Sequence, residues 1–307
     1  MLATQRAALA TQRAALATRR AVLGTRRAAL GTLGVALVAG VSWGAEVQPD
    51  TQGLPAYRRD RGVGVSSSMF GTYIRKGQLI VYPYFEYYRD SNFEYSPNEL
   101  GFTEDRDYRG DYEASEALLF IGCGLSDRLV LEVEGAIIQA ELETSSQDFS
   151  GLPSAIEESG VGDIESQLRW RWTEETPRRP EVFSYFETVF PTQEKGSLIG
   201  TTDWEFQLGL GVIRGLSWGT MTVRAAVEYD RAENAFGIGE AAVEYLKRLS
   251  PAWRIFGSVE GTGDEIELIT EAQWHFAPYA YLKLNNAFGL TSKAPDWAPE
   301  IGVLFSL

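Results

Sequence analysis

The feature that most constrains this chain is a two-residue alternation of apolar and polar side chains, which begins near residue 78 and continues to the C-terminus. In the stretch GDIESQLRWRW, polar residues at Asp163, Glu165 and Gln167 alternate with Ile164, Ser166 and Leu168. A period of two is that of a strand with two chemically different faces. The alternation predicts an all-β fold of about twelve strands, near 78–88, 113–124, 128–142, 162–173, 181–190, 204–213, 219–230, 238–248, 252–260, 265–276, 279–290 and 299–307.

The alternation leaves open whether the apolar face meets a soluble core or a lipid bilayer. After residue 45 there is no run of about 18 apolar residues, and a mean hydropathy of -0.17 is too polar for a bundle of membrane helices. A membrane-spanning version must therefore be a closed antiparallel transmembrane β-barrel. Large aromatic residues near the predicted strand ends favour this version, because such barrels carry two aromatic girdles; they are Trp170, Trp172, Trp253, Trp274 and Phe276 near short turns, and Phe190, Trp204, Tyr229 and Phe288 near long loops.

The connections alternate in length, which is typical of transmembrane barrels with long outer loops and short periplasmic turns. Long connections are expected near 89–112, 143–161 and 191–203, with moderate ones near 231–237 and 291–298. Short turns are expected at GLSDR, EETPRRP, RGLSWG, SPAW and APY, and GTGD is short where a long loop would be expected. An even strand number places both termini in the periplasm, with the closing segment PEIGVLFSL as the last strand.

The N-terminal segment predicts export. A basic region with seven-residue repeats precedes an apolar stretch with a small-residue exit, the pattern of a secretory signal peptide. A short coiled coil, an organellar transit peptide and an over-long gene start are the alternatives. The expected organisation is a signal peptide at 1–45, an irregular periplasmic lead-in or small plug at 46–76 and the barrel at 77–307.

Charge and composition exclude several function classes. The net charge of -14 argues against a nucleic-acid partner, because phosphate binding needs clustered Lys and Arg. A single Cys, Cys123, and a single His, His275, exclude a Cys/His zinc cluster, and the Gly-rich GVGVSSS does not lie between a strand and a helix as a phosphate loop would. We therefore expect no cofactor, and the expected partners are outer-membrane lipid, the barrel-assembly machinery and a small-molecule solute.

The charged face of the strands supplies the candidate lumen-lining residues. They either line a water-filled channel, where the acid excess favours cations or uncharged solutes, or pair into a network that fills the lumen. Twelve strands lie between filled and open barrels, so strand number does not decide. The candidates are Glu132, Glu134, Asp163, Glu165, Arg169, Arg171, Glu187, Glu205, Arg224, Glu228, Glu240, Glu244, Arg254, Glu260, Glu267, Glu271, His275 and Lys283.

Catalytic and metal sites are weaker alternatives. His275 could serve a hydrolase with a Ser and an acid, but no nucleophile motif is present, and a hydrogen-bonded lumen histidine is the simpler interpretation. Pairs such as Asp163/Glu165 and Glu265/Glu267 arise on any alternating charged strand. The acids Glu104, Asp105, Asp107, Asp111, Glu157 and Glu158 lack regular cation-ligand spacing. We expect no enzyme.

Four segments, GLSDRLVLEVEGA, GVGDIESQLRWRW, FETVFPTQEKG and PEIGVLFSL, resemble the phenol-degradation (MetA-pathway) outer-membrane family over about 76–307. Gln193 stands where that family has Gly, and the last residue is Leu307 in place of Phe. The resemblance implies an outer-membrane barrel that passes aromatic or other small hydrophobic compounds, without catalytic residues. Sequence thus predicts a passive channel in the Gram-negative outer membrane, with a closed structural or interaction barrel acting through its long loops as the alternative.

Overall fold

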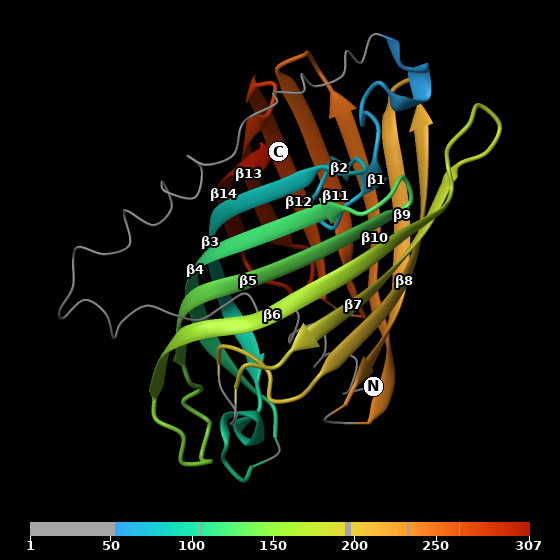
Figure 1. Ribbon diagram of the computed structural model, residues 1–307. Coiled ribbons are helices and arrows are strands. Elements are labelled where there is room, and N and C mark those ends of the chain that lie inside the picture. Colours follow the sequence, from blue (N-terminus) through green and yellow to red (C-terminus); the bar gives the residue numbers. More distant parts are fainter. Residues whose placement is uncertain (1–52, 105, 194–197, 232–233, 264) are drawn as a thin grey trace.

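The computed structural model describes residues 53–104, 106–193, 198–231, 234–263 and 265–307, so the predicted signal peptide lies outside the described part of the chain. The predicted all-β barrel is confirmed: twelve strands form one closed sheet (Figure 1). The strands are β3 (Leu79–Tyr95), β4 (Tyr108–Gly124), β5 (Leu129–Glu143), β6 (Ala155–Thr173), β7 (Glu181–Phe190), β8 (Glu205–Leu216), β9 (Gly219–Asp230), β10 (Ala235–Arg248), β11 (Trp253–Thr262), β12 (Glu265–Ala277), β13 (Ala280–Gly289) and β14 (Ala298–Ser306).

Every strand pairs antiparallel with its neighbours in sequence, and the last strand closes the barrel against the first. In that closure, Phe305 lies opposite Val81, and Leu79 and Leu307 exchange two backbone hydrogen bonds of 2.8 and 3.0 Å. Closure removes the free strand edges, which is what a bilayer requires of a sheet.

The outer face of the sheet is apolar. Leu210 on β8 is 62% exposed. On β6, Trp170 and Trp172 are exposed, whereas the alternating residues Arg169 and Arg171 are buried. The predicted aromatic girdles form ring contacts on this face, with centroids 6.2 Å apart for Trp253–Trp274 and 4.9 Å for Phe190–Trp204, in line with their expected lipid contact.

Two predicted loops are shorter than expected. The prediction of a loop over 89–112 is wrong, because β3 continues to Tyr95 and β4 starts at Tyr108; the loop over 143–161 shrinks to 144–154. The reason is an inversion of polarity within the strands. Beyond Tyr88, inward residues such as Phe93 and Tyr112 are apolar and buried, while their outward neighbours are polar, so the outward-apolar pattern stops although the strands continue.

The two ends of the barrel differ. Short turns connect β4–β5, β6–β7, β8–β9, β10–β11 and β12–β13, and we call this the short-turn end. The longer connections, including one with a 3-10 helix at Pro97–Leu100, lie at the opposite, long-loop end. Among the described residues, no helix has the length and apolar character needed to cross a membrane.

Candidate functional site

The lead-in before β3 folds into the barrel at the short-turn end. A 3-10 helix, η2 (Ala56–Arg58), precedes a small hairpin of β1 (Val65–Ser66) and β2 (Tyr73–Ile74), which Figure 1 shows within the barrel. The ring of Phe70 at the hairpin tip stacks on Phe256 of β11 with centroids 4.9 Å apart. The hydroxyls of Thr72 and Tyr281 lie 2.9 Å apart. The hairpin therefore packs directly on the inner barrel wall.

Buried charges hold the lead-in against the wall. The Arg61 guanidinium lies 2.9 Å from Glu175 and 3.0 Å from Glu181, and both carboxylate side chains are 0% exposed. Two predicted lumen residues join them: Arg171 donates to the Gly64 carbonyl at 2.7 Å, and Glu132 accepts the Ser68 backbone amide at 3.0 Å. These charges are paired, as burial requires.

Three more of the predicted residues belong to the same packed end. Lys283 lies 3.0 Å from Glu271 and donates to the Phe70 carbonyl at 3.3 Å. The Arg169 guanidinium lies over the Phe183 and Tyr185 rings at 5.3 and 5.0 Å from their centroids. These residues serve hairpin docking and wall packing.

The middle of the interior carries carboxylates that face one another across strands. Glu86 lies opposite both Glu300 and Glu116, and Glu134 lies opposite Glu165. Like charges at directly opposed positions are destabilising unless something offsets them. In the described part of the chain no hydrogen bond or ion pair reaches the carboxylates of Glu86 or Glu165.

Burial separates these glutamates into two kinds. Glu116 is 1% exposed, and neither carboxylate oxygen has a partner among the described residues. Glu86, Glu134, Glu165 and Glu300 are half-buried although they point inward. An inward side chain in a closed barrel can be exposed only to space inside the barrel, so space large enough for water adjoins these four side chains.

On the far side of the interior, one cation serves several acids. Arg224 lies 2.8 Å from Glu244 and 3.1 Å from Glu260, and it also pairs with Glu240. Glu260 lies directly opposite Glu267 on β12, another like-charge pair. This side of the barrel therefore also has more acid than base.

The other predicted residues have separate roles. Asp163 accepts the backbone amides of Thr192 and Thr201 at 2.9 and 2.6 Å and so anchors the β7–β8 connection. Glu187 accepts a hydrogen bond from the Gln167 amide. Glu205 is half-buried, while Glu228 and Arg254 are buried.

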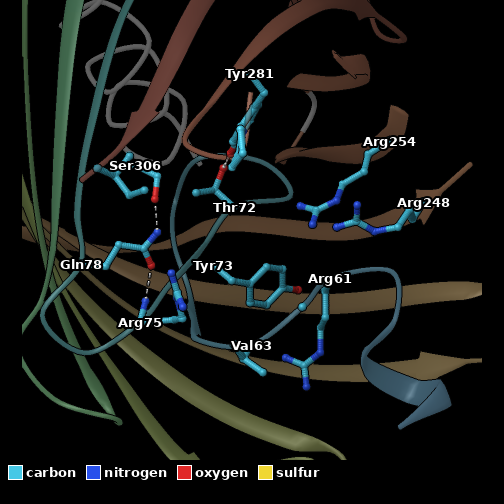
Figure 2. Close-up of a pocket in the computed structure, with 13 residues that line it drawn as sticks. Arg61, Val63, Thr72, Tyr73, Arg75, Gln78, Arg248, Arg254, Tyr281 and Ser306 are labelled. Atoms are coloured by element: carbon cyan, nitrogen blue, oxygen red, sulfur yellow. Dashed lines mark hydrogen bonds between the residues drawn. The ribbon is translucent and has the colours of Figure 1, made fainter. Parts of the chain in front are cut away.

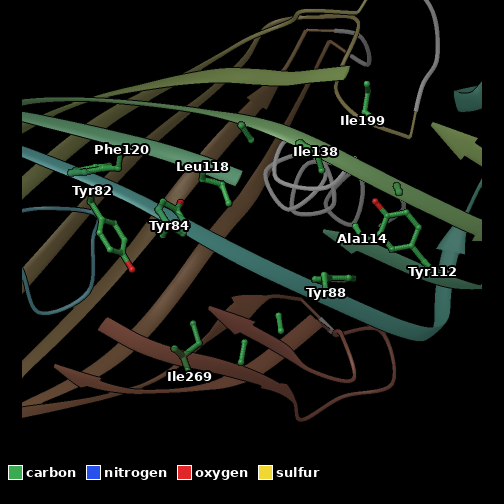
Figure 3. Packing of buried hydrophobic residues seen from close by; sticks show 14 of the residues in the cluster. Tyr82, Tyr84, Tyr88, Tyr112, Ala114, Leu118, Phe120, Ile138, Ile199 and Ile269 are labelled. Carbon is green, nitrogen blue, oxygen red and sulfur yellow. The ribbon is translucent and has the colours of Figure 1, made fainter. Parts of the chain in front are cut away.

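Sequence analysis missed an apolar stretch of the interior, the aromatic wall, defined by Tyr82, Tyr84, Tyr88, Tyr112 and Phe120 on β3 and β4 (Figure 3). The Tyr84 hydroxyl donates to Glu134 at 2.7 Å, and the Tyr82 hydroxyl donates to Glu300. The wall thus lies against the carboxylates. The same strand parity that selected the charged residues also points these rings inward, and that signal could have found them.

The residues of the alternative sites have structural contacts of their own. The His275 ring packs on the Tyr281 ring with centroids 4.4 Å apart. Asp111 pairs with Arg89, and Glu158 accepts the Leu198 amide at 2.7 Å. Asp105 lies outside the described residues, and no group of three or more potential metal ligands occurs in the part of the chain that the structure describes.

Comparisons with known proteins bear on the fold. No family model matches the chain, and no curated protein matches it. The COG4313 outer membrane channel from Pseudomonas putida F1 is similar in structure, with a TM-score of 0.58 and 13% identity over 79% of this chain and 100% of that one. The translocator domain of autotransporter NalP from Neisseria meningitidis (TM-score 0.49, 9% identity, 75% of this chain and 88% of that one) and the P. putida toluene transporter TodX (0.42, 10%, 84% and 99%) are more distant. The first likeness shows that this chain has the closed-barrel fold of outer-membrane proteins.

Proposed function

We propose that this protein is a passive outer-membrane channel for small solutes, and that uncharged and cationic solutes pass most readily. The observation that carries the proposal is the half-exposed, inward-facing set of glutamates in the middle of the barrel, such as Glu86 and Glu165. An ionised carboxylate without a counter-ion is tolerable only where water reaches it, because burial favours the neutral form. The interior at this level is therefore a water-filled passage.

The charge of the passage sets its selectivity. Rings of acidic side chains favour cations over anions in pores. The lining residues of this passage are Glu86, Glu134, Glu165, Glu187, Glu205, Glu240, Glu244, Glu267 and Glu300, with Arg224 as their main cation. Anionic solutes meet an unfavourable potential along this stretch.

The aromatic wall supports the lining carboxylates from within the packed part of the interior. The Tyr84 and Tyr82 hydroxyls donate to Glu134 and Glu300, while the rings themselves are buried. The proposal that aromatic or other small hydrophobic compounds pass therefore rests on the resemblance to the phenol-degradation family.

We place the short-turn end in the periplasm, because short periplasmic turns and long outer loops are the habit of these barrels. On this orientation both ends of the mature chain face the periplasm and the hairpin is a plug at the exit. Residues 1–45 act as the cleaved export signal. N-terminal sequencing of protein purified from outer membranes tests this, and an intact N-terminus would contradict it.

Selectivity measurements test the channel. The reversal potential of the full protein in a planar bilayer with a KCl gradient should show cation preference. Glu165→Lys should lower the cation-to-anion permeability ratio several-fold, whereas the exposed Glu143 at the end of β5 provides a matched control, Glu143→Lys, with little effect. An unchanged ratio in Glu165→Lys and in a second lining variant, Glu134→Lys, would refute the proposal.

The second candidate is a closed barrel that acts through its long-loop end. The packed hairpin at the short-turn end favours it, because Arg61, Glu175 and Glu181 close that end with buried ion pairs. A barrel of this kind inserts but does not conduct. Its phenotype would instead depend on the 96–107 and 144–154 loops.

A further inference from the structure

We propose that the cavity between the hairpin and the barrel wall at the short-turn end is a binding site for a small oxyanion, a carboxylate or phosphate group. The cavity has a volume of about 70 Å³. Four arginines line it: Arg61 and Arg75 from the lead-in, and Arg248 and Arg254 from β10 and β11 (Figure 2). Among the described residues, no carboxylate side chain lines it.

Arg254 is the residue that most needs a ligand. It is 7% exposed, its Nε has no hydrogen-bond partner, and no ion pair reaches it from the described residues. Figure 2 shows its side chain extending into the cavity. A buried charge without an ion-pair partner destabilises the protein, so an anion bound from solution would offset the desolvation free energy of Arg254.

Arg248 adds a second positive charge beside the cavity. It lies directly opposite Arg254 in the β10–β11 register, and like charges at such positions repel. Its Nε donates to the Arg59 carbonyl at 3.2 Å, whereas its Nη2 is buried without a partner. The nearby Asp60 carboxylate bonds to the Arg248 backbone amide and pairs with Lys247. Asp60 also acts on the Arg248 charge electrostatically. Among the described residues, however, neither the Arg248 nor the Arg254 guanidinium forms an ion pair within 4 Å.

The chemistry of the lining selects the ligand. Planar guanidinium groups bind carboxylate and phosphate oxygens with paired N–H donors. Arg61 is already neutralised by Glu175 and Glu181, so the available positive charge comes from the β10–β11 pair. The Tyr73 ring, 5.3 Å from the Arg61 guanidinium, forms the hairpin side of the same cavity.

Access comes from the short-turn end. Pro278 in the β12–β13 turn and Gly62 in the lead-in line the cavity, and the glutamate-rich middle of the barrel lies on the other side. An anion arriving through that middle would be repelled. A bound oxyanion would connect the lead-in to the wall and so stabilise the docked hairpin.

Isothermal titration calorimetry with inorganic phosphate tests the site, using the full protein purified in detergent at fixed ionic strength. Saturable binding is expected, and Arg254→Gln should weaken it by roughly thirtyfold or more, as for the loss of one partner of a buried charge pair. The matched control is Arg128→Gln, an exposed arginine in the β4–β5 turn at the same end of the barrel, which should leave the affinity unchanged.

Control experiments distinguish binding at this site from general charge effects and from misfolding of the variants. Acetate should compete with phosphate, whereas chloride at the same concentration should not. Heat-dependent gel mobility checks that each variant is folded, and Arg248→Gln supplies a second variant should Arg254→Gln fail to assemble. Absence of saturable phosphate binding, or equal affinity in Arg248→Gln, Arg254→Gln and the wild type, would overturn the proposal.

Discussion

The short-turn end and the middle of the barrel are built from the same strands but treat charge differently. Around the hairpin, Glu175 and Glu181 are 0% exposed and share the Arg61 guanidinium. In the middle, Glu86 and Glu165 have no such partner among the described residues and remain half-buried. For these four glutamates, paired charge accompanies packing and unpaired charge accompanies space for water. Glu116 and Arg254 depart from this rule, because they are buried without an ion pair among the described residues.

A single strand pattern thus builds both a packed end and a half-exposed middle. Inward glutamates occur at both levels, and the difference comes from the lead-in, which supplies Arg61 and the Ser68 amide to one level alone. A water-filled middle and a packed end are therefore compatible within one barrel.

The largest expected effect comes from breaking the packed end. Arg61→Gln removes the guanidinium that two buried carboxylates share, and leaves Glu175 with Arg214 at 3.4 Å and Glu181 with Arg171 at 3.8 Å. Breaking these shorter buried pairs should cost about 3–5 kcal/mol of stability. The loss should also loosen the hairpin and raise single-channel conductance. Urea unfolding in detergent and planar-bilayer recording measure the two effects. Unchanged stability would show that the paired end does not depend on this cation.

The outer face provides the next test, since it should affect stability without affecting conduction. Leu210→Arg places a charge on the lipid-facing side of β8 and should cost about 2–4 kcal/mol if this position lies near the bilayer midplane. Leu210→Ala is the conservative control. Changed ion selectivity in folded Leu210→Arg protein would contradict the assignment of inner and outer faces.

A smaller effect of opposite sign should come from the middle of the barrel. Glu116→Gln removes one charge of the opposed Glu86/Glu116 pair and should stabilise the protein by about 0.2–1 kcal/mol. The matched change at the paired level, Glu132→Gln, should destabilise, because Glu132 accepts hydrogen bonds from Ser68. Chemical unfolding measures the change in unfolding free energy of both variants. A change of the same sign in both would contradict the difference between the paired and the unpaired level.

The smallest effect should come from an ion pair at the edge of the packed end. The Arg58–Glu174 pair is 2.7 Å long, but the Glu174 side chain is 54% exposed. Glu174→Gln should therefore cost under about 1 kcal/mol, because solvent screens such pairs. A loss of stability as large as that of Arg61→Gln would mean that burial does not determine how much an ion pair contributes to stability here.

The strand pattern predicted most of the barrel because alternation survives wherever one face meets lipid. It failed on β3 and β4, where residues such as Asp111 and Glu113 face outward beyond the expected bilayer and the apolar side turns inward. A rule that reserves the inner face for charge cannot find Tyr82 or Tyr112. Strand parity placed the candidate residues, but the lining role of those residues stays a prediction.

The pairing of charges could not be predicted in the same way. Which inward residues become packed depends on where the lead-in folds, and Arg61 meets Glu181 across 120 positions of the chain. No periodicity encodes such a contact. The four-arginine cavity was missed for the same reason, since it brings Arg61 and Arg75 next to Arg248 and Arg254.

Single-channel recording of the full protein in a planar bilayer is the most direct test of a water-filled middle. Insertion is verified by the mobility difference between heated and unheated protein on a gel. We predict discrete conductance steps with cation preference. Verified insertion without any conductance, in the wild type and in Arg61→Gln, would contradict the channel and favour the closed barrel.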